Sequence, residues 1–125
     1  MRIQILGLAL VLTACAIPVQ DFATRAVHVK VKGNYSAIGQ CIVAQMQSGR
    51  YEPSSTQYQE FSTSKTAQIQ SAAAFVVALR ITLVQDGDNV QAEIWGHKAI
   101  NDLWTNDGMR FVKNCDGRAG KPNHG

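Results

Sequence analysis

Two stretches of the chain alternate strictly between apolar and polar residues. Over residues 27–32 a valine occupies every second position, with His or Lys between them. A longer run over residues 75–84 keeps one side wholly apolar, and after the Asp-Gly-Asp-Asn segment at 86–89 the alternation resumes over residues 90–95. A period of two is typical of a strand with one buried face, and a Gly-containing turn between two such runs predicts a hairpin. We therefore expect a strand at 27–32 and an antiparallel hairpin over 75–95.

Two further stretches repeat at helical spacing and predict helices that each bury one stripe. Their apolar stripes are Ile38, Cys41, Ile42 and Met46 in the first, and Met109, Val112 and Cys115 in the second. Ser36 is the expected N-cap of the first helix, and Asn106 or Thr105 that of the second. Gly49 and Gly117 are the expected ends of the two helices. Weaker strand patterns lie around Tyr58 and Phe61 and over residues 66–70.

The element order is therefore β-α-β-β-β-β-α, in an α+β domain over residues 27–117. A helix cannot bury its apolar stripe alone, so we expect a two-layer fold with both helices on one face of an antiparallel sheet of about five strands. This layout resembles the small two-layer domains of envelope-assembly lipoproteins. Residues 118–125, with Gly120 and Pro122, predict a disordered tail.

The amino terminus has the pattern of a secretory signal. Arg2 is followed by about ten mostly apolar residues and then by small ones. A bilayer-spanning helix needs roughly 20 apolar residues, so this segment is too short to be a permanent membrane span. We expect residues 1–14 to be removed as a signal peptide.

The end of this segment, Leu12-Thr13-Ala14-Cys15, resembles the lipobox of bacterial lipoproteins. The resemblance implies acylation of Cys15, cleavage before it, and a tether over residues 15–26. Because Ala16 follows the cysteine where lipoproteins of the inner membrane carry Asp, the resemblance favours the outer membrane, with the domain facing the periplasm. Two or more acyl chains are needed for stable anchoring, which a triacylated Cys15 would provide. The alternative is ordinary cleavage after Ala16, which would free a soluble domain beginning at Ile17.

Net charge excludes nucleic acid as the partner. The whole chain carries a formal charge of +3 at pH 7, and loss of the signal removes Arg2 and leaves +2. Lys and Arg are spread along the sequence with no cluster, whereas nucleic-acid binding requires a basic patch.

After Cys15 is set aside, Cys41 and Cys115 remain, and we expect them to form a disulfide. Exported proteins meet an oxidising compartment, where two leftover thiols usually pair. A zinc site is disfavoured because neither cysteine has another Cys or a His at ligand spacing, and a Cys–His nucleophile would require one of His28, His97 or His124 beside it. Both cysteines lie on helical stripes, so the bond would join the two helices.

No catalytic, metal-binding or nucleotide-binding motif stands out, and no cofactor is expected. The candidate binding surface is Trp95, His97 and Trp104, since exposed aromatic side chains often mark contact sites. The alternative is that Trp95 is covered by the loop that carries Trp104 or by a neighbouring strand. The favoured hypothesis is a non-catalytic periplasmic domain that binds another envelope protein as an assembly accessory. The alternatives are a small-ligand or glycan-binding domain with a pocket near the two tryptophans, and a hydrolase built from groups distant in sequence.

Overall fold

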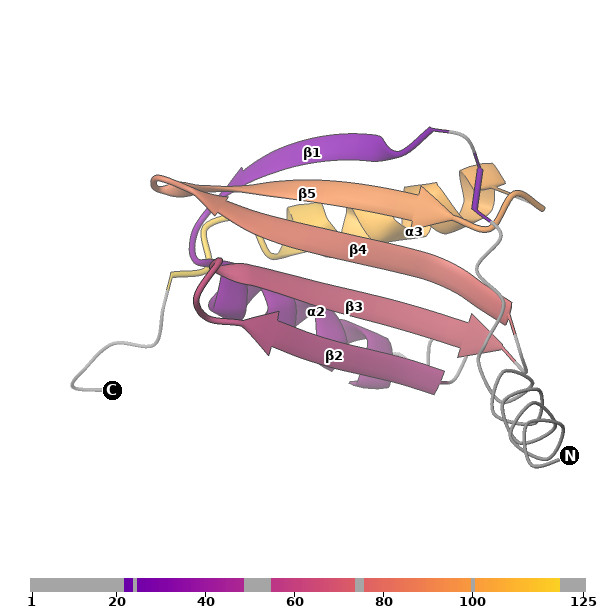
Figure 1. Ribbon diagram of the computed structural model, residues 1–125, viewed down its shortest axis with the longest axis horizontal. Coiled ribbons are helices and arrows are strands. Elements are labelled where there is room, and N and C mark those ends of the chain that lie inside the picture. Colours follow the sequence, from indigo (N-terminus) through magenta and orange to yellow (C-terminus); the bar gives the residue numbers. More distant parts are fainter. Residues whose placement is uncertain (1–21, 24, 49–54, 74–75, 100, 120–125) are drawn as a thin grey trace, which may run out of the picture.

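The protein forms a two-layer α+β fold, as the hydrophobic pattern predicts. The computed structural model describes residues 22–23, 25–48, 55–73, 76–99 and 101–119. Its elements are β1 (Val27–Lys32), α2 (Tyr35–Ser48), β2 (Ser55–Phe61), β3 (Thr66–Ala73), β4 (Val76–Asp86), β5 (Asn89–Gly96) and α3 (Asn101–Asn114). The sheet has five antiparallel strands in the order β1-β5-β4-β3-β2, and both helices lie behind it in the view of Figure 1.

The core lies between this sheet and the two helices. α2 packs mainly over β3 and β2, and α3 mainly over β5 and β1. The central strands contribute large side chains with no exposed surface: Ile69, Leu79, Ile81, Leu83 and Ile94. The helices add Ile38, Ile42, Met46, Phe111, Val112 and Cys115, so the stripes inferred from the sequence do face the sheet. Burial of these apolar surfaces is the main driving force for this fold.

α3 approaches the sheet closely because a glycine lies at the contact. A Cβ at Gly108 would lie 2.6 Å from Cγ2 of Ile94 and 3.2 Å from Cδ1 of Leu79. Such separations are too short for carbon atoms in contact, which prefer about 3.5–4.0 Å. Glycine is therefore the residue that lets the helix axis come this near to β5.

Two of the expected helix starts are wrong. Asn34, and not Ser36, caps α2, because its Oδ1 accepts hydrogen bonds from the backbone N–H groups of Ser36 (2.9 Å) and Ala37 (3.1 Å). α3 begins at Asn101, ahead of the expected cap at 105–106, so Trp104 belongs to the first turns of the helix. The expected helix end at Gly49 lies outside the described residues.

The folded domain also extends beyond residues 27–117 at both ends. Phe22, which we expected in the tether, pairs with His97, and the N–H of Ala23 donates to the carbonyl of Gly96 at 3.0 Å. Arg118, which we expected in the tail, pairs with Gly33 and accepts a hydrogen bond from the N–H of Asn34 at 2.9 Å. These backbone pairings are non-local, so no periodicity in the sequence could reveal them.

Candidate functional site

The expected anchor, Cys15, and the signal segment 1–14 lie outside the described residues. Among the residues that are described, no helix has both the length and the hydropathy needed to cross a membrane. The side chains that can be placed fall into three groups: the junction of α2 with α3, the aromatic group at the end of β5, and a cluster around Glu60.

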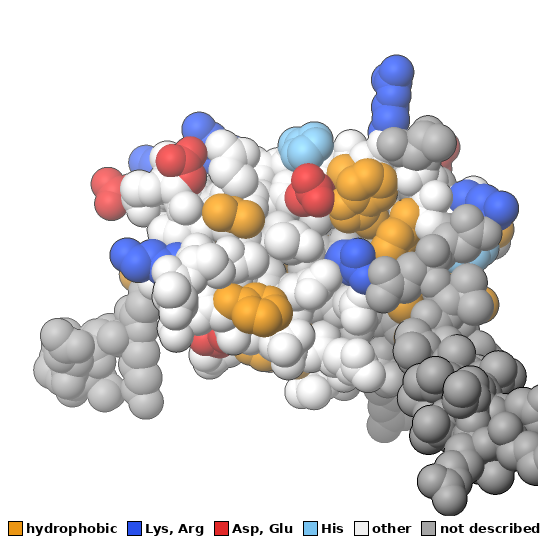
Figure 2. Space-filling model, viewed as in Figure 1, with side chains coloured by type: hydrophobic (Ala, Val, Ile, Leu, Met, Phe, Trp, Pro, Cys, Tyr) orange, Lys and Arg blue, Asp and Glu red, His pale blue; other side chains and the backbone are white. Residues whose placement is uncertain are grey.

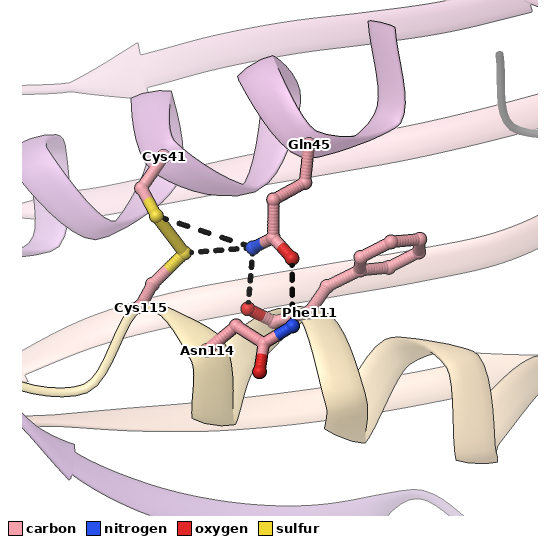
Figure 3. The surroundings of a disulfide bond; sticks show 5 residues. All are labelled: Cys41, Gln45, Phe111, Asn114 and Cys115. Atoms are coloured by element: carbon pink, nitrogen blue, oxygen red, sulfur yellow. Dashed lines mark hydrogen bonds between the residues drawn. A yellow bond between two sulfur atoms is a disulfide. The ribbon is translucent and has the colours of Figure 1, made fainter. Parts of the chain in front are cut away.

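A disulfide joins the two helices at the first of these places. The sulfur atoms of Cys41 and Cys115 lie 2.07 Å apart and their Cα atoms 6.0 Å apart, across 74 residues of sequence (Figure 3). Cys115 is fully buried at the end of α3, whereas Cys41 is half-buried on the flank of α2. Burial of this kind indicates a structural bond and not a reactive thiol.

Gln45 reinforces the junction one helical turn beyond Cys41. Its Nε2 donates to the carbonyl of Phe111 at 2.9 Å, and its Oε1 accepts from Nδ2 of Asn114 at 3.0 Å (Figure 3). The same Nε2 lies 2.9 Å from Sγ of Cys115. The amide therefore uses both of its ends to hold α2 against the last turn of α3. No local pattern in the sequence marks Gln45, because these partners lie about seventy positions away.

Trp95 lies on the face of the sheet that the helices leave open. It alternates with the buried Ile94 and is half-buried itself. Its Nε1 donates to Oε1 of Glu93 at 2.7 Å, and the ring of Phe22 packs against it with centroids 6.2 Å apart.

Arg80 completes this aromatic group. Its guanidinium lies 4.9 Å from the ring centroid of Phe22, and its Nε donates to Oε1 of Gln70 at 2.9 Å. Burial lowers the pKa of Arg80 from its ordinary value. The cation is thus held between an aromatic ring and an amide oxygen.

The structure does not bring the three expected surface residues together. His97 directly follows β5, where its backbone N–H donates to Ala78 and its Nδ1 accepts from the N–H of Ala99 at 3.1 Å. Trp104 lies on α3, packs against the core, and donates from Nε1 to the carbonyl of Ala99 at 3.2 Å. Trp95 and Trp104 therefore lie on opposite faces of the sheet, and they do not line one common pocket.

A cluster that the sequence did not indicate lies at the start of α2. One carboxylate oxygen of Glu60 accepts hydrogen bonds from the hydroxyls of Tyr58 and Ser36, the latter at 2.8 Å, and from Nε2 of Gln40 at 3.4 Å. The bond from Tyr58, followed by that from Ser36, lowers the pKa of Glu60. Burial and the neighbouring carboxylate raise the pKa of Tyr58 well above its ordinary value of 10.0. This cluster fastens α2 to β2.

Charge is distributed very unevenly over the described elements. α2, β2 and β3 together contain a single charged residue, Glu60. By contrast, α3 alone contains four: Asp102, Asp107, Arg110 and Lys113. In Figure 2 the open face of the sheet is largely white, which marks uncharged polar side chains and backbone, with separate orange groups. A shallow depression of about 410 Å³ on the β2 side of this face is lined by Tyr58 and by four glutamines: Gln57, Gln59, Gln68 and Gln70.

Within the described part of the chain, no group of three or more His, Cys, Asp or Glu side chains is placed to hold a metal ion.

No protein-family model matches the chain, and no curated protein matches it significantly.

Proposed function

We propose that this protein is a lipoprotein of a bacterial cell envelope, anchored in the outer membrane through acylated Cys15. Its small domain faces the periplasm and binds another envelope protein as an assembly or scaffolding accessory. The observation that carries the proposal is the Leu12-Thr13-Ala14-Cys15 segment, which ends a short apolar stretch and resembles a lipobox. The chemistry of lipidation needs a thiol at this place, since sulfur is the nucleophile.

The position at which the fold begins supports a short tether. Among the described residues, Phe22 is the first to pair with the sheet, at His97, and it lies seven positions after Cys15. Fully extended, such a segment spans at most roughly 25 Å. A domain tethered in this way stays next to the bilayer and meets partners that lie at or near the membrane surface.

The arrangement of the polar groups favours a binding role over catalysis. The carboxylate of Glu60 is engaged by three donors, that of Glu93 by Trp95, and the Arg80 guanidinium by Gln70 and Phe22. These contacts stabilise the fold and orient the side chains toward one another. A catalytic acid or base must come within hydrogen-bond distance of the substrate proton that it transfers. These three groups instead contact neighbouring side chains of the fold.

The test is the intact mass of the mature protein, purified in detergent from membranes, with and without reductant. We expect a chain that begins at Cys15 and carries lipid, and a gain of about 2 Da on reduction as each sulfur takes up one hydrogen. The Cys15→Ser variant is the matched control and should lack the lipid mass. A soluble wild-type species beginning at Ile17 would contradict the anchor and favour a freely diffusing ligand-binding domain.

A further inference from the structure

The two edges of the sheet differ in how well they are protected. At the β1 edge, the backbone N–H of Lys32 donates to Oδ1 of Asp116 at 2.9 Å, and its carbonyl accepts from the N–H of Gly117 at 2.8 Å. Lys30 and Lys32 add charge along the same strand. Covering segments and lysines are the devices by which proteins prevent an edge strand from pairing with another chain.

Among the described residues, the β2 edge has neither a covering segment nor a lysine in its strand. β2 is the last strand of the sheet, and no other described segment pairs with its outer side. Its sequence, Ser-Thr-Gln-Tyr-Gln-Glu-Phe, contains neither Pro nor Lys. A strand of seven residues is about 24 Å long and presents a row of backbone donors and acceptors that can be completed by an added strand.

The described elements around this edge, α2, β2 and β3, carry a single charged residue, Glu60. The stripe of α2 beside β2 carries Ser36, Gln40, Val43 and Gln47, which follow one another at helical spacing. The carboxylate of Glu60 is turned onto this helix by its bonds to Ser36 and Gln40. Depletion of charged residues is what distinguishes the centre of a protein interface from the rest of a surface. An uncharged surface also meets a second copy of itself without repulsion.

We propose that the β2 edge pairs with the β2 edge of a second copy of this chain, which joins two sheets into one continuous antiparallel sheet. The inference specifies the partner for the interaction role proposed above and rests on that role, and it does not rest on the lipid anchor. The register follows from the strand itself. Among the antiparallel registers, the one centred on Tyr58 is the one that pairs all seven residues of Ser55–Phe61 with residues of the other copy.

This register aligns side chains of matching chemistry. Gln57 of one copy lies opposite Gln59 of the other, on the open face, and extends the rows that begin with Gln70 opposite Gln57 and Gln68 opposite Gln59. Glu60 lies opposite Thr56 of the second copy, so the two carboxylates do not meet. Uncharged polar side chains that lie opposite each other on neighbouring strands can interact favourably, whereas two side chains of the same charge in these positions destabilise a sheet.

The two-fold axis of this dimer also fits two anchored chains. It runs perpendicular to the sheet, so the Phe22 ends of the two copies lie at opposite ends of the joined sheet. Both tethers reach one bilayer when the sheet lies parallel to the membrane.

The experiment uses the detergent-extracted mature protein in sedimentation equilibrium, at concentrations from about 1 μM to 1 mM, the range in which small interfaces associate. Wild type should form a reversible dimer. A Gln57→Lys, Gln59→Lys variant opposes lysines at two places and should dimerise at least about tenfold more weakly, as should the Gln57→Glu, Gln59→Glu variant. A mixture of the two should restore a dimer that contains one copy of each. The control is Val84→Lys, which adds a lysine at an exposed position of the same face on β4, opposite the uncharged Thr66 and Gln91, and which should dimerise like wild type.

Three results would overturn the proposal. They are a wild-type protein that stays monomeric throughout, a lysine variant that dimerises like wild type, and a mixture of the two charge variants that does not associate. Both glutamines are exposed, so the variants should melt like wild type, and the melting temperature checks that each is folded. Loss of the dimer with an intact lipid mass would separate failure of this pairing from failure of the anchor.

Discussion

Glu60 shows how one residue can determine the local electrostatics of this protein. It is the single charge among the residues of α2, β2 and β3, and three side chains donate to it. Hydrogen bonds to a carboxylate favour its charged form, so the folded protein holds the pKa of Glu60 below its ordinary value of 4.5. The folded state therefore binds fewer protons at this site than the unfolded chain does.

Replacing Glu60 should make the protein less sensitive to acid. Because the folded pKa is lowered, the stabilisation is present above the unfolded pKa and is lost as the pH falls through the folded pKa. We expect the melting temperature of wild type to fall more than that of Glu60→Gln between about pH 7 and pH 3, a range that brackets the ordinary pKa of Glu. Ser36→Ala, which removes one of the three donors, should give an intermediate slope. Parallel curves for wild type and Glu60→Gln would contradict this account.

At the scale of elements, close contact between α3 and β5 depends on Gly108. Alanine is normally the better helix former, by about 1 kcal/mol. Here the added methyl group would lie 2.6 Å from Cγ2 of Ile94, a fully buried side chain, so an atom on one side of the contact must shift. The packing penalty should therefore reverse the usual effect of the substitution.

We expect Gly108→Ala to lower the free energy of unfolding by about 1–3 kcal/mol, which is typical of overpacking in a core. Asn106→Ala, at an exposed position of the same helix, should change it by no more than about 0.5 kcal/mol. Chemical denaturation of the two variants measures both values. A stabilised Gly108→Ala protein would show that α3 can shift away from the sheet at little cost.

At the scale of the whole molecule, the disulfide closes a loop that contains four of the five strands. Cys41 precedes β2, and Cys115 follows both β5 and α3. Closing a long loop restricts the unfolded chain more than a short one. The bond also joins α2, which contains no charged residue, to the end of α3, which contains four.

Removing this bond should lower the stability of the entire domain. We expect the Cys41→Ser, Cys115→Ser variant to lose about 2–5 kcal/mol of unfolding free energy, the usual effect of deleting a native disulfide from a small domain. Wild type with reductant should unfold at the same denaturant concentration as this variant. Unchanged unfolding in both cases would show that the bond contributes nothing to stability.

Features that depend on residues close together in the sequence could be predicted, whereas contacts between residues far apart in the sequence could not. Hydrophobic period and turn chemistry are local, so the valine strand, the hairpin and the core stripes of both helices followed from neighbouring residues. The cap at Asn34 was missed in favour of Ser36, two positions on, because several polar residues near a helix start can serve as caps. The bonds of Gln45 to Phe111 and Asn114, and those of Glu60 to Ser36 and Gln40, join residues 20 to 69 positions apart, and no local pattern marks them.

The class of fold and the order of its elements follow from the periodicity of the sequence alone, whereas the choice of Cys41 and Cys115 as partners also depended on setting Cys15 aside for its resemblance to a lipobox cysteine. The tertiary structure was needed to show which side chains share one face of the sheet and which strand edges are covered. It placed Trp95 and Trp104 on opposite faces, covered the Lys32 end of the β1 edge with Asp116 and Gly117, and left the β2 edge without a partner among the described residues. Strand order and helix placement depend on which apolar surfaces are buried together. That burial involves residues far apart in the sequence, so no local pattern encodes it.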